Sequence, residues 1–198
     1  MFRTSVSAAV LLLSSPALAG EVLYQFRSEE DPKAVADPIA ACKVAPFEVN
    51  VRLPGSLFVP EQNPADGKVK AGGQKKVGTA LACVRITDRT FPEGSQADMY
   101  ARFEVPEGRF VAVGKCTVVS NAVPRAGIVL AGCALKLTEQ PAAYAGGFVT
   151  SASVFNPLGQ PGFNTGSLWT LRVFEPEAQP PKQPAKDPGK DAAKEPKK

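Results

Sequence analysis

Apolar and polar residues alternate one by one in short runs along most of the chain. The clearest run is FEVNVRL at 47–53, where four apolar side chains would share one face of an extended backbone and three polar side chains the other. A repeat of two is typical of a β-strand with one buried and one wet face. Such runs, together with apolar stretches bounded by turn residues, predict eight strands, at 21–27, 47–53, 79–87, 98–105, 110–119, 127–138, 146–155 and 167–175.

Eight short strands with turn-rich connections, and no pattern for a long helix, predict an all-β domain. We expect a small antiparallel β-barrel of about eight strands, because eight strands close around an interior that side chains just fill. Gly114 and Gly132 lie within predicted strands, where glycine fits the tight curvature of a barrel. A β-sandwich is the alternative fold. An outer-membrane barrel is a further option, which the cysteines, the few aromatic residues and the charged C-terminal segment disfavour.

The four cysteines predict two disulfide bonds. If the chain turns back between residues 124 and 125, Cys116 on one predicted strand lies opposite Cys133 on the next. Directly opposed residues of antiparallel strands have Cα atoms about 4.5–5.5 Å apart, a distance that a disulfide spans. This pairing leaves Cys42 to bond with Cys83, while the other pairings stay open at this stage. No two cysteines form a C-x-x-C motif, so neither a zinc ribbon nor a thioredoxin-like site is expected.

The first 19 residues have the three parts of a secretory signal peptide. Arg3 supplies a positive start, residues 8–13 form an apolar core, and Ala17-Leu18-Ala19 is a small-x-small cleavage site. We expect cleavage after Ala19 and export of the mature chain to the periplasm or the extracellular space. The apolar run is shorter than the roughly 20 residues that a membrane-spanning helix needs, and no later segment reaches that length. The mature protein is therefore expected to be soluble and not membrane-spanning.

The C-terminal segment 176–198 is rich in proline and lysine and has no aromatic or β-branched residue. Such a segment buries too little apolar surface to offset its ordering entropy, so we expect a disordered tail. Residues 20–175 then form a single β domain. The formal net charge of +4 comes mostly from the two ends of the chain, so it does not predict nucleic-acid binding.

The chain contains no histidine, which excludes His-ligated metal sites and His-dependent catalysis. The lysine- and glycine-rich segment 61–77 lacks a phosphate-binding pattern and is expected to be a solvated loop. The acidic residues 29–31 lack the ligand spacing of a calcium loop. The single tryptophan, Trp169, lies on an alternating strand, where core packing is its expected role. The sequence therefore predicts no catalytic residue, no cofactor-binding residue and no metal ligand.

Three functions stay open on the sequence alone. The first is a non-enzymatic exported β-domain that binds a small apolar ligand or a component of the cell envelope. The second is a metal-independent cyclase, isomerase or lyase, which would need an ionisable side chain inside an apolar pocket. Several ionisable candidates on the strands are expected to face outward, namely Tyr100, Arg102, Glu104 and Arg172. The third is a structural or assembly subunit that pairs through an exposed strand edge, if the sheet is open.

Overall fold

The computed structural model describes residues 20–62 and 69–176. The predicted signal peptide lies outside the described residues, and so does the predicted tail apart from Pro176. In chain order the elements are β1 (Glu21–Glu30), α1 (Pro38–Ala41), the 3-10 helix η1 (Cys42–Val44), β2 (Val51–Gln62), β3 (Val69–Arg85), β4 (Gln96–Val105), β5 (Gly108–Ser120), β6 (Val129–Glu139), β7 (Gly146–Phe155) and β8 (Gly166–Phe174). Neither helix in this part of the chain has the length and apolar character needed to cross a lipid bilayer.

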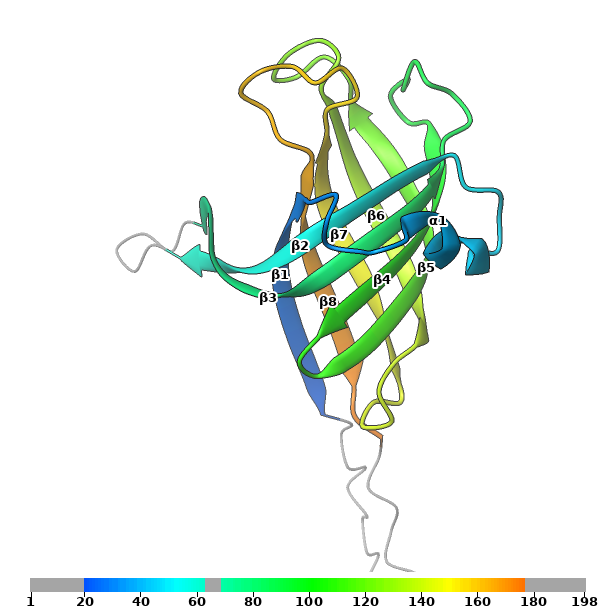
Figure 1. The fold of residues 1–198 in the computed structure, drawn as a ribbon, viewed down its shortest axis with the longest axis vertical. Coiled ribbons are helices and arrows are strands. Elements are labelled where there is room, and N and C mark those ends of the chain that lie inside the picture. The colour runs from blue at the N-terminus through cyan, green and yellow to red at the C-terminus, as the bar shows by residue number, and fades with distance from the viewer. Residues whose placement is uncertain (1–19, 63–68, 177–198) are drawn as a thin grey trace, which may run out of the picture. The chain divides into compact units, whose positions relative to one another are not determined.

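The eight strands form one closed antiparallel barrel (Figure 1). Each strand pairs with the next along the chain, and a ladder from Glu21 opposite Phe174 to Glu29 opposite Gly166 joins β1 to β8. The predicted all-β fold and the barrel are confirmed, and the β-sandwich alternative is wrong. Because the first strand pairs with the last, the wall that these strands build has no open sheet edge.

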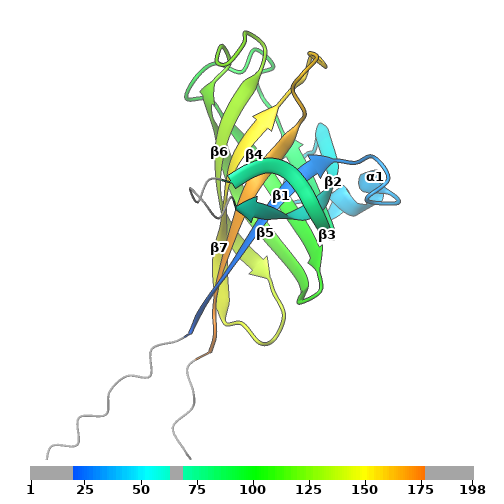
Figure 2. The same cartoon turned by 90° about the vertical axis from the view of Figure 1, so that its left-hand side faces the viewer.

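The hairpin of β2 and β3 extends beyond the barrel wall (Figures 1 and 2). β1 pairs with β2 only as far as Phe58, and β4 pairs with β3 only from Thr79 onward. Beyond these points β2 and β3 pair with each other, out to Gln62 opposite Val69. The prediction of a loop at 61–77 is therefore wrong wherever the structure describes that segment. A strand that leaves the wall has no barrel interior to face, which explains the missing alternation.

The strand predicted at 47–53 begins later than its sequence pattern suggests. β2 starts at Val51 and continues through Pro54, which the pattern marks as its end. Just before β2, the backbone N–H of Asn50 still donates to the carbonyl oxygen of Val84 at 3.0 Å, while the Asn50 side chain pairs with Ile86. Its Nδ2 donates to the carbonyl oxygen of Ile86 at 2.7 Å, and the Ile86 amide donates to its Oδ1 at 2.9 Å. The alternating pattern at 47–50 therefore lies before the point at which the backbone joins the sheet, at Val51.

The inward side chains of the strands form the main core of the barrel. At its centre Phe103 (1% exposed) and Trp169 (3% exposed) pack edge to face, with ring centroids 5.1 Å apart. The prediction that Trp169 belongs to the core is confirmed. Of the two glycines predicted to allow tight barrel curvature, Gly114 is required by a close approach, because a Cβ there would lie 2.2 Å from the carbonyl oxygen of Ala134. Gly132 is not required in this way, because a Cβ there would lie 3.9 Å from the nearest atom, the carbonyl oxygen of Ser151.

A second, smaller core lies outside the barrel, beneath the segment 31–50 that joins β1 to β2, which we call the strap. Within the strap, Asp37 caps α1 because its Oδ1 accepts the backbone N–H of Ala40 at 2.9 Å. Figure 1 shows α1 against the outer face of the wall. The buried residues of this outer core come from the strap and from β3 to β5: Cys42, Leu81, Cys83, Tyr100 and Val111.

Both predicted cysteine pairs lie at disulfide distance. Cys116 is directly opposite Cys133 in the β5–β6 ladder, and both side chains belong to the core inside the barrel. Cys42 bonds to Cys83 with Cα atoms 5.7 Å apart, which ties the strap to the outside of β3. Two disulfides indicate that the folded chain belongs in an oxidising environment.

Asp98 on β4 connects positive charges on the two neighbouring strands of the outer wall. Arg85 on β3 donates from Nε to Asp98 Oδ2 at 2.8 Å, and the Nζ of Lys115 on β5 lies 3.6 Å from Oδ1. The hydrogen bond from Arg85, helped by both positive charges, lowers the pKa of the Asp98 carboxyl below its ordinary value.

Asp98→Asn is expected to make the free energy of unfolding less sensitive to acid. A carboxyl with a lower pKa in the folded state adds stability above its unfolded pKa of about 3.9, and this stability is lost as the pH falls through the folded pKa. Urea unfolding at about pH 7 and about pH 3 measures the effect. The variant should lose less stability between these two conditions than the parent protein. Equal losses would contradict the assignment of Asp98 as an acid-sensitive contact.

Candidate functional site

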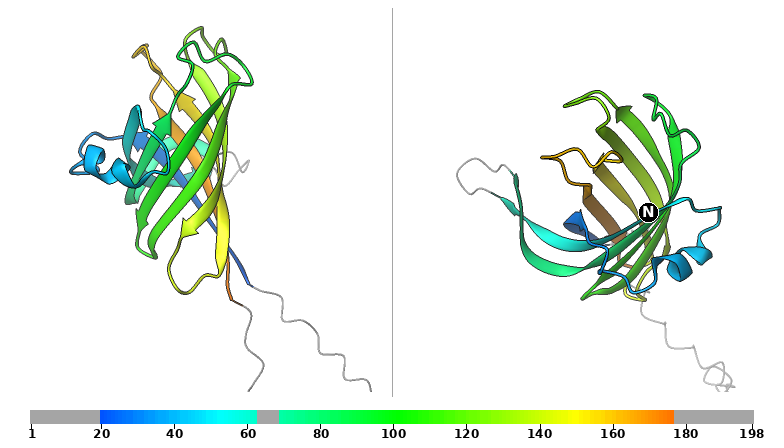
Figure 3. Two further views of the ribbon diagram at one scale, coloured as in Figure 1. Left: turned by 90° about the vertical axis from the view of Figure 1, so that its right-hand side faces the viewer. Right: turned by 45° about the horizontal axis from the view of Figure 1, so that its top comes forward.

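The barrel contains an apolar cavity that opens at one end. Its volume is about 110 Å³, and inward side chains from all eight strands line it. The opening lies at the end where four loops gather, the β1–β2, β3–β4, β5–β6 and β7–β8 connections (Figure 3, right). We call this cavity the inner cavity. Because its lining is mainly apolar and lies inside the barrel, with a few hydroxyl groups among the lining residues, it is the candidate site.

Small residues on β3 and β4 create the space for the inner cavity. Ala80 and Ala82 on β3 lie opposite Phe103 and Ala101 on β4, and all four line the cavity. An inward alanine leaves unfilled the volume that a leucine or phenylalanine would occupy. The hydrogen-bonded ladders of a closed barrel prevent the wall from collapsing into that volume. The small residues of the sequence are thus the local cause of the cavity.

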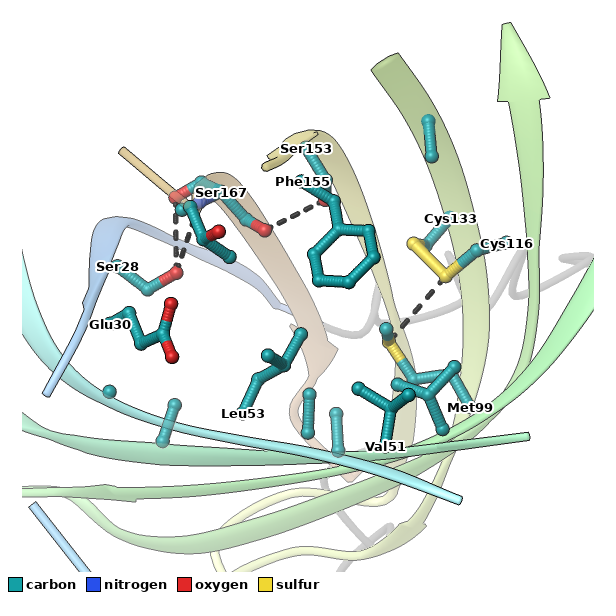
Figure 4. Close-up of a pocket in the computed structure, with 18 of the residues that line it drawn as sticks. Ser28, Glu30, Val51, Leu53, Met99, Cys116, Cys133, Ser153, Phe155 and Ser167 are labelled. Carbon is teal, nitrogen blue, oxygen red and sulfur yellow. Dashed lines mark hydrogen bonds between the residues drawn. A yellow bond between two sulfur atoms is a disulfide. The ribbon is translucent and has the colours of Figure 1, made fainter. Parts of the chain in front are cut away.

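Sulfur atoms form part of the cavity wall (Figure 4). The Cys116–Cys133 disulfide lines the cavity, and the thioether sulfur of Met99 lies 3.5 Å from the Cys116 sulfur. Disulfide and thioether groups are polarisable and carry no charge, so they offer apolar contact to a ligand. The bond also fixes β5 to β6 at the depth of the cavity.

Hydroxyl groups line one side of the otherwise apolar interior (Figure 4). On β7, Ser151 Oγ and Ser153 Oγ are 2.9 Å apart, and Ser153 Oγ is 2.7 Å from Ser167 Oγ on β8. Ser28 on β1 lies next to this chain, because its Oγ accepts the backbone N–H of Ser167 at 3.1 Å. We call these four residues, Ser28, Ser151, Ser153 and Ser167, the serine patch. Ser28, Ser153 and Ser167 line the inner cavity.

Ser28 also holds the single tryptophan in place. The indole N–H of Trp169 donates to Ser28 Oγ at 3.0 Å, so a buried donor is paired inside the barrel. The indole ring lines the inner cavity beside the serine patch. A molecule that enters the cavity therefore changes the surroundings of this indole ring. The indole N–H resonance of Trp169 can thus report ligand binding.

A wider mouth of about 860 Å³ leads into the inner cavity. The two spaces share residues such as Glu30, Leu53 and Phe155, so they are continuous. Phe91 on the β3–β4 connection packs edge to face on Phe155, with ring centroids 5.6 Å apart. Phe91 adopts a left-handed conformation with φ of 50°, which is uncommon for a bulky side chain. This strained residue places one of the two aromatic rings at the entrance.

Aromatic side chains fill the opposite end of the barrel. Tyr24 on β1 and Tyr144 on the β6–β7 connection share a hydrogen bond between their hydroxyl groups. The Tyr24 and Tyr144 rings also pack against Phe110, with centroid distances of 6.2 Å and 5.8 Å respectively. Burial, together with the hydrogen bond between the Tyr24 and Tyr144 hydroxyls, raises the pKa of Tyr24 well above its ordinary range. The Tyr24 hydroxyl therefore stays neutral, and this aromatic cluster, none of whose rings lines the inner cavity, fills the barrel on this side.

The ionisable residues considered from the sequence do not gather at the cavity. Arg102 and Glu104 form an ion pair on the outer wall, with 3.4 Å between Arg102 Nε and Glu104 Oε1. Arg172 Nε lies 2.8 Å from Glu21 Oε1, also outside. Tyr100 faces outward as expected, but the strap buries it. Among the described residues, no three His, Cys, Asp or Glu side chains cluster where they could hold a metal ion.

Sequence reasoning missed the serine patch, although a signal for it was present. Ser151 and Ser153 have the same parity along β7 as the buried Val149, and Ser167 has the same parity along β8 as Trp169. A run of serines at inward positions of an otherwise apolar barrel is the pattern that could have revealed it.

No protein-family model matches the chain, and the searches of curated proteins and of solved structures gave no match either.

Proposed function

We propose that this protein is a non-enzymatic binding protein that encloses a small, mainly apolar molecule in the inner cavity. The observation that carries the proposal is the apolar cavity itself, which is continuous with an open mouth at one end. Burial of apolar ligand surface contributes about 25 cal/mol per Å². An apolar cavity of about 150 Å³ in another protein binds benzene. The inner cavity, with about 110 Å³ and an open mouth, therefore suits a single ring or a short chain.

Two properties of the barrel support tight rather than transient binding. The wall is a closed hydrogen-bonded sheet with a disulfide at the level of the cavity, so the site is formed before the ligand arrives. A preformed site spares the ligand the free energy of ordering side chains and loops. The Phe91 and Phe155 rings line both the inner cavity and its mouth, so a bound ligand gains apolar contact at the entrance as well.

The proposal includes export to the periplasm or the extracellular space, with cleavage after Ala19. The two disulfides support an oxidising compartment. We expect the intact mass of protein recovered from an exporting host to match a chain that starts at Gly20 with both disulfides formed. A mass that retains residues 1–19, or that shows free thiols, would contradict the proposed route.

Native mass spectrometry of that same preparation tests the binding proposal. We expect an additional mass of a small organic molecule that is lost on denaturation. Recovery of the bare chain even after incubation with excess single-ring compounds would count against a cavity ligand. Co-fractionation with the cell envelope in the absence of any cavity ligand would favour the alternative partner, an envelope component.

A further inference from the structure

We infer that the ligand of the inner cavity carries a neutral oxygen acceptor, a carbonyl or hydroxyl oxygen, which accepts a hydrogen bond from the serine patch. The inference rests on the proposed function and specifies its ligand class. A purely apolar molecule would fill the cavity but leave the patch unused. The argument depends on how the serine protons are distributed, on the charges around the cavity and on its size.

The serine patch has more donors than its internal hydrogen bonds consume. Three hydroxyl groups, those of Ser151, Ser153 and Ser167, are joined by two hydrogen bonds. Each hydroxyl has one proton, so at least one of the three protons is left over after these two bonds form. Ser28 accepts two N–H donors and has only a long contact of 3.5 Å to the Ser167 carbonyl oxygen for its own proton. The Ser28 proton is therefore available at the cavity wall, and the leftover proton of the three-serine chain joins it when it lies on Ser153 or Ser167.

The leftover donors point to an acceptor on the ligand. Ser28, Ser153 and Ser167 line the cavity on one side, while Val84, Met99 and the Cys116–Cys133 disulfide provide apolar wall elsewhere. A polar donor in an apolar enclosure gains most when a ligand oxygen pairs with it, because an unpaired buried hydroxyl costs free energy. A ligand with an apolar skeleton and one oxygen atom matches this cavity, because the skeleton contacts the apolar wall and the oxygen meets the serine hydroxyls.

The charges around the inner cavity favour a neutral acceptor over a carboxylate. Within the part of the chain that the structure describes, the charged residues lining the inner cavity are Glu29 and Glu30, and both are acidic. Glu29 forms an ion pair with Arg27, and Glu30 lies at the junction with the mouth. A carboxylate on the ligand would enter the cavity without a cation to meet it, and an unpaired buried charge is strongly unfavourable.

Three compounds of similar size separate the possibilities: ethylbenzene, acetophenone and benzoate. Acetophenone adds a carbonyl oxygen to the ethylbenzene skeleton, and benzoate replaces the acetophenone methyl group with a charged oxygen. Titrations of ¹⁵N-labelled protein follow the indole N–H resonance of Trp169, the single tryptophan of the chain. The test variant is Ser153→Ala/Ser167→Ala. The matched control is Thr150→Ala/Thr170→Ala, which removes two hydroxyls from the same strands at directly paired positions on the outer wall.

We expect the parent protein and the threonine control to bind ethylbenzene and acetophenone, and not to bind benzoate detectably. In the serine variant, the affinity for acetophenone should fall by about threefold to tenfold, the range for one hydrogen bond, while the affinity for ethylbenzene stays the same. Equal changes for both ligands, or benzoate binding as tight as acetophenone binding, would overturn the neutral-acceptor inference and leave the cavity proposal standing. If neither neutral compound shifts the Trp169 resonance of the parent protein, the proposed function fails and the inference fails with it.

Discussion

Ala131→Phe is expected to weaken acetophenone binding by about 100-fold or more, which corresponds to about 2.7 kcal/mol. Ala131 lies on β6 between the inward residues Val129 and Cys133, and its side chain lines the inner cavity. A phenyl ring at this position would occupy the space that a single-ring ligand needs. Because the ring enters an existing space, the free energy of unfolding should fall by no more than about 1 kcal/mol, the lower end of the overpacking range.

Ala134→Phe is the matched control for this loss of binding. Ala134 lies on the same strand, but its position faces outward and its side chain is exposed. The control should therefore bind acetophenone as the parent protein does. Titration of the Trp169 resonance together with urea unfolding separates blocked binding from unfolding. A folded Ala131→Phe protein that binds with parental affinity would show that the ligand lies elsewhere.

Phe103→Ala is expected to lower the free energy of unfolding by about 3–5 kcal/mol, the usual range for removing a buried phenylalanine. The Phe103 side chain is 1% exposed and packs edge to face on Trp169. It lines the inner cavity and lies opposite Ala80 on β3. Its removal eliminates apolar contacts and enlarges the inner cavity at the same time. Urea or guanidinium unfolding, monitored by circular dichroism, measures the difference.

Phe148→Ala provides the comparison for Phe103. The Phe148 side chain is 39% exposed on the outer wall, where its ring lies beneath the Arg172 guanidinium at 5.4 Å. The loss of this contact should lower the free energy of unfolding by at most about 1 kcal/mol. If both variants lose the same stability, the assignment of Phe103 to the inner core and Phe148 to the outer face would be wrong.

The barrel could be predicted from sequence because its strands face water on one side and a core on the other. Runs such as 98–105 and 167–175 carry the period-two alternation that this arrangement requires, and both strands appear close to those bounds. The Cys116–Cys133 pair followed from the hairpin register, since antiparallel pairing places these two residues directly opposite each other. These features are local, so a single sequence contains them.

Other features depend on contacts that alternation does not encode. The β2–β3 extension beyond Phe58 and Thr79 has no barrel interior to face, so its strands lack the usual pattern. The strap buries Tyr100 on a face that the strand pattern marks as wet, because residues far away in the chain fold over it. The inner cavity arises only when eight strands close and their inward alanines meet. Serines at inward positions gain meaning only after that closure.

Crystals of the protein under xenon pressure would test the central claim, an apolar cavity inside the barrel that accepts a ligand, most directly. Xenon enters apolar cavities of this size, and its electron density marks their position without chemical specificity. The account predicts a xenon atom inside the barrel, in contact with Trp169, Met99 and the Cys116–Cys133 disulfide. The same experiment on Ala131→Phe should show this position empty. An empty barrel in the parent protein, with xenon absent or bound only at the surface, would contradict the account.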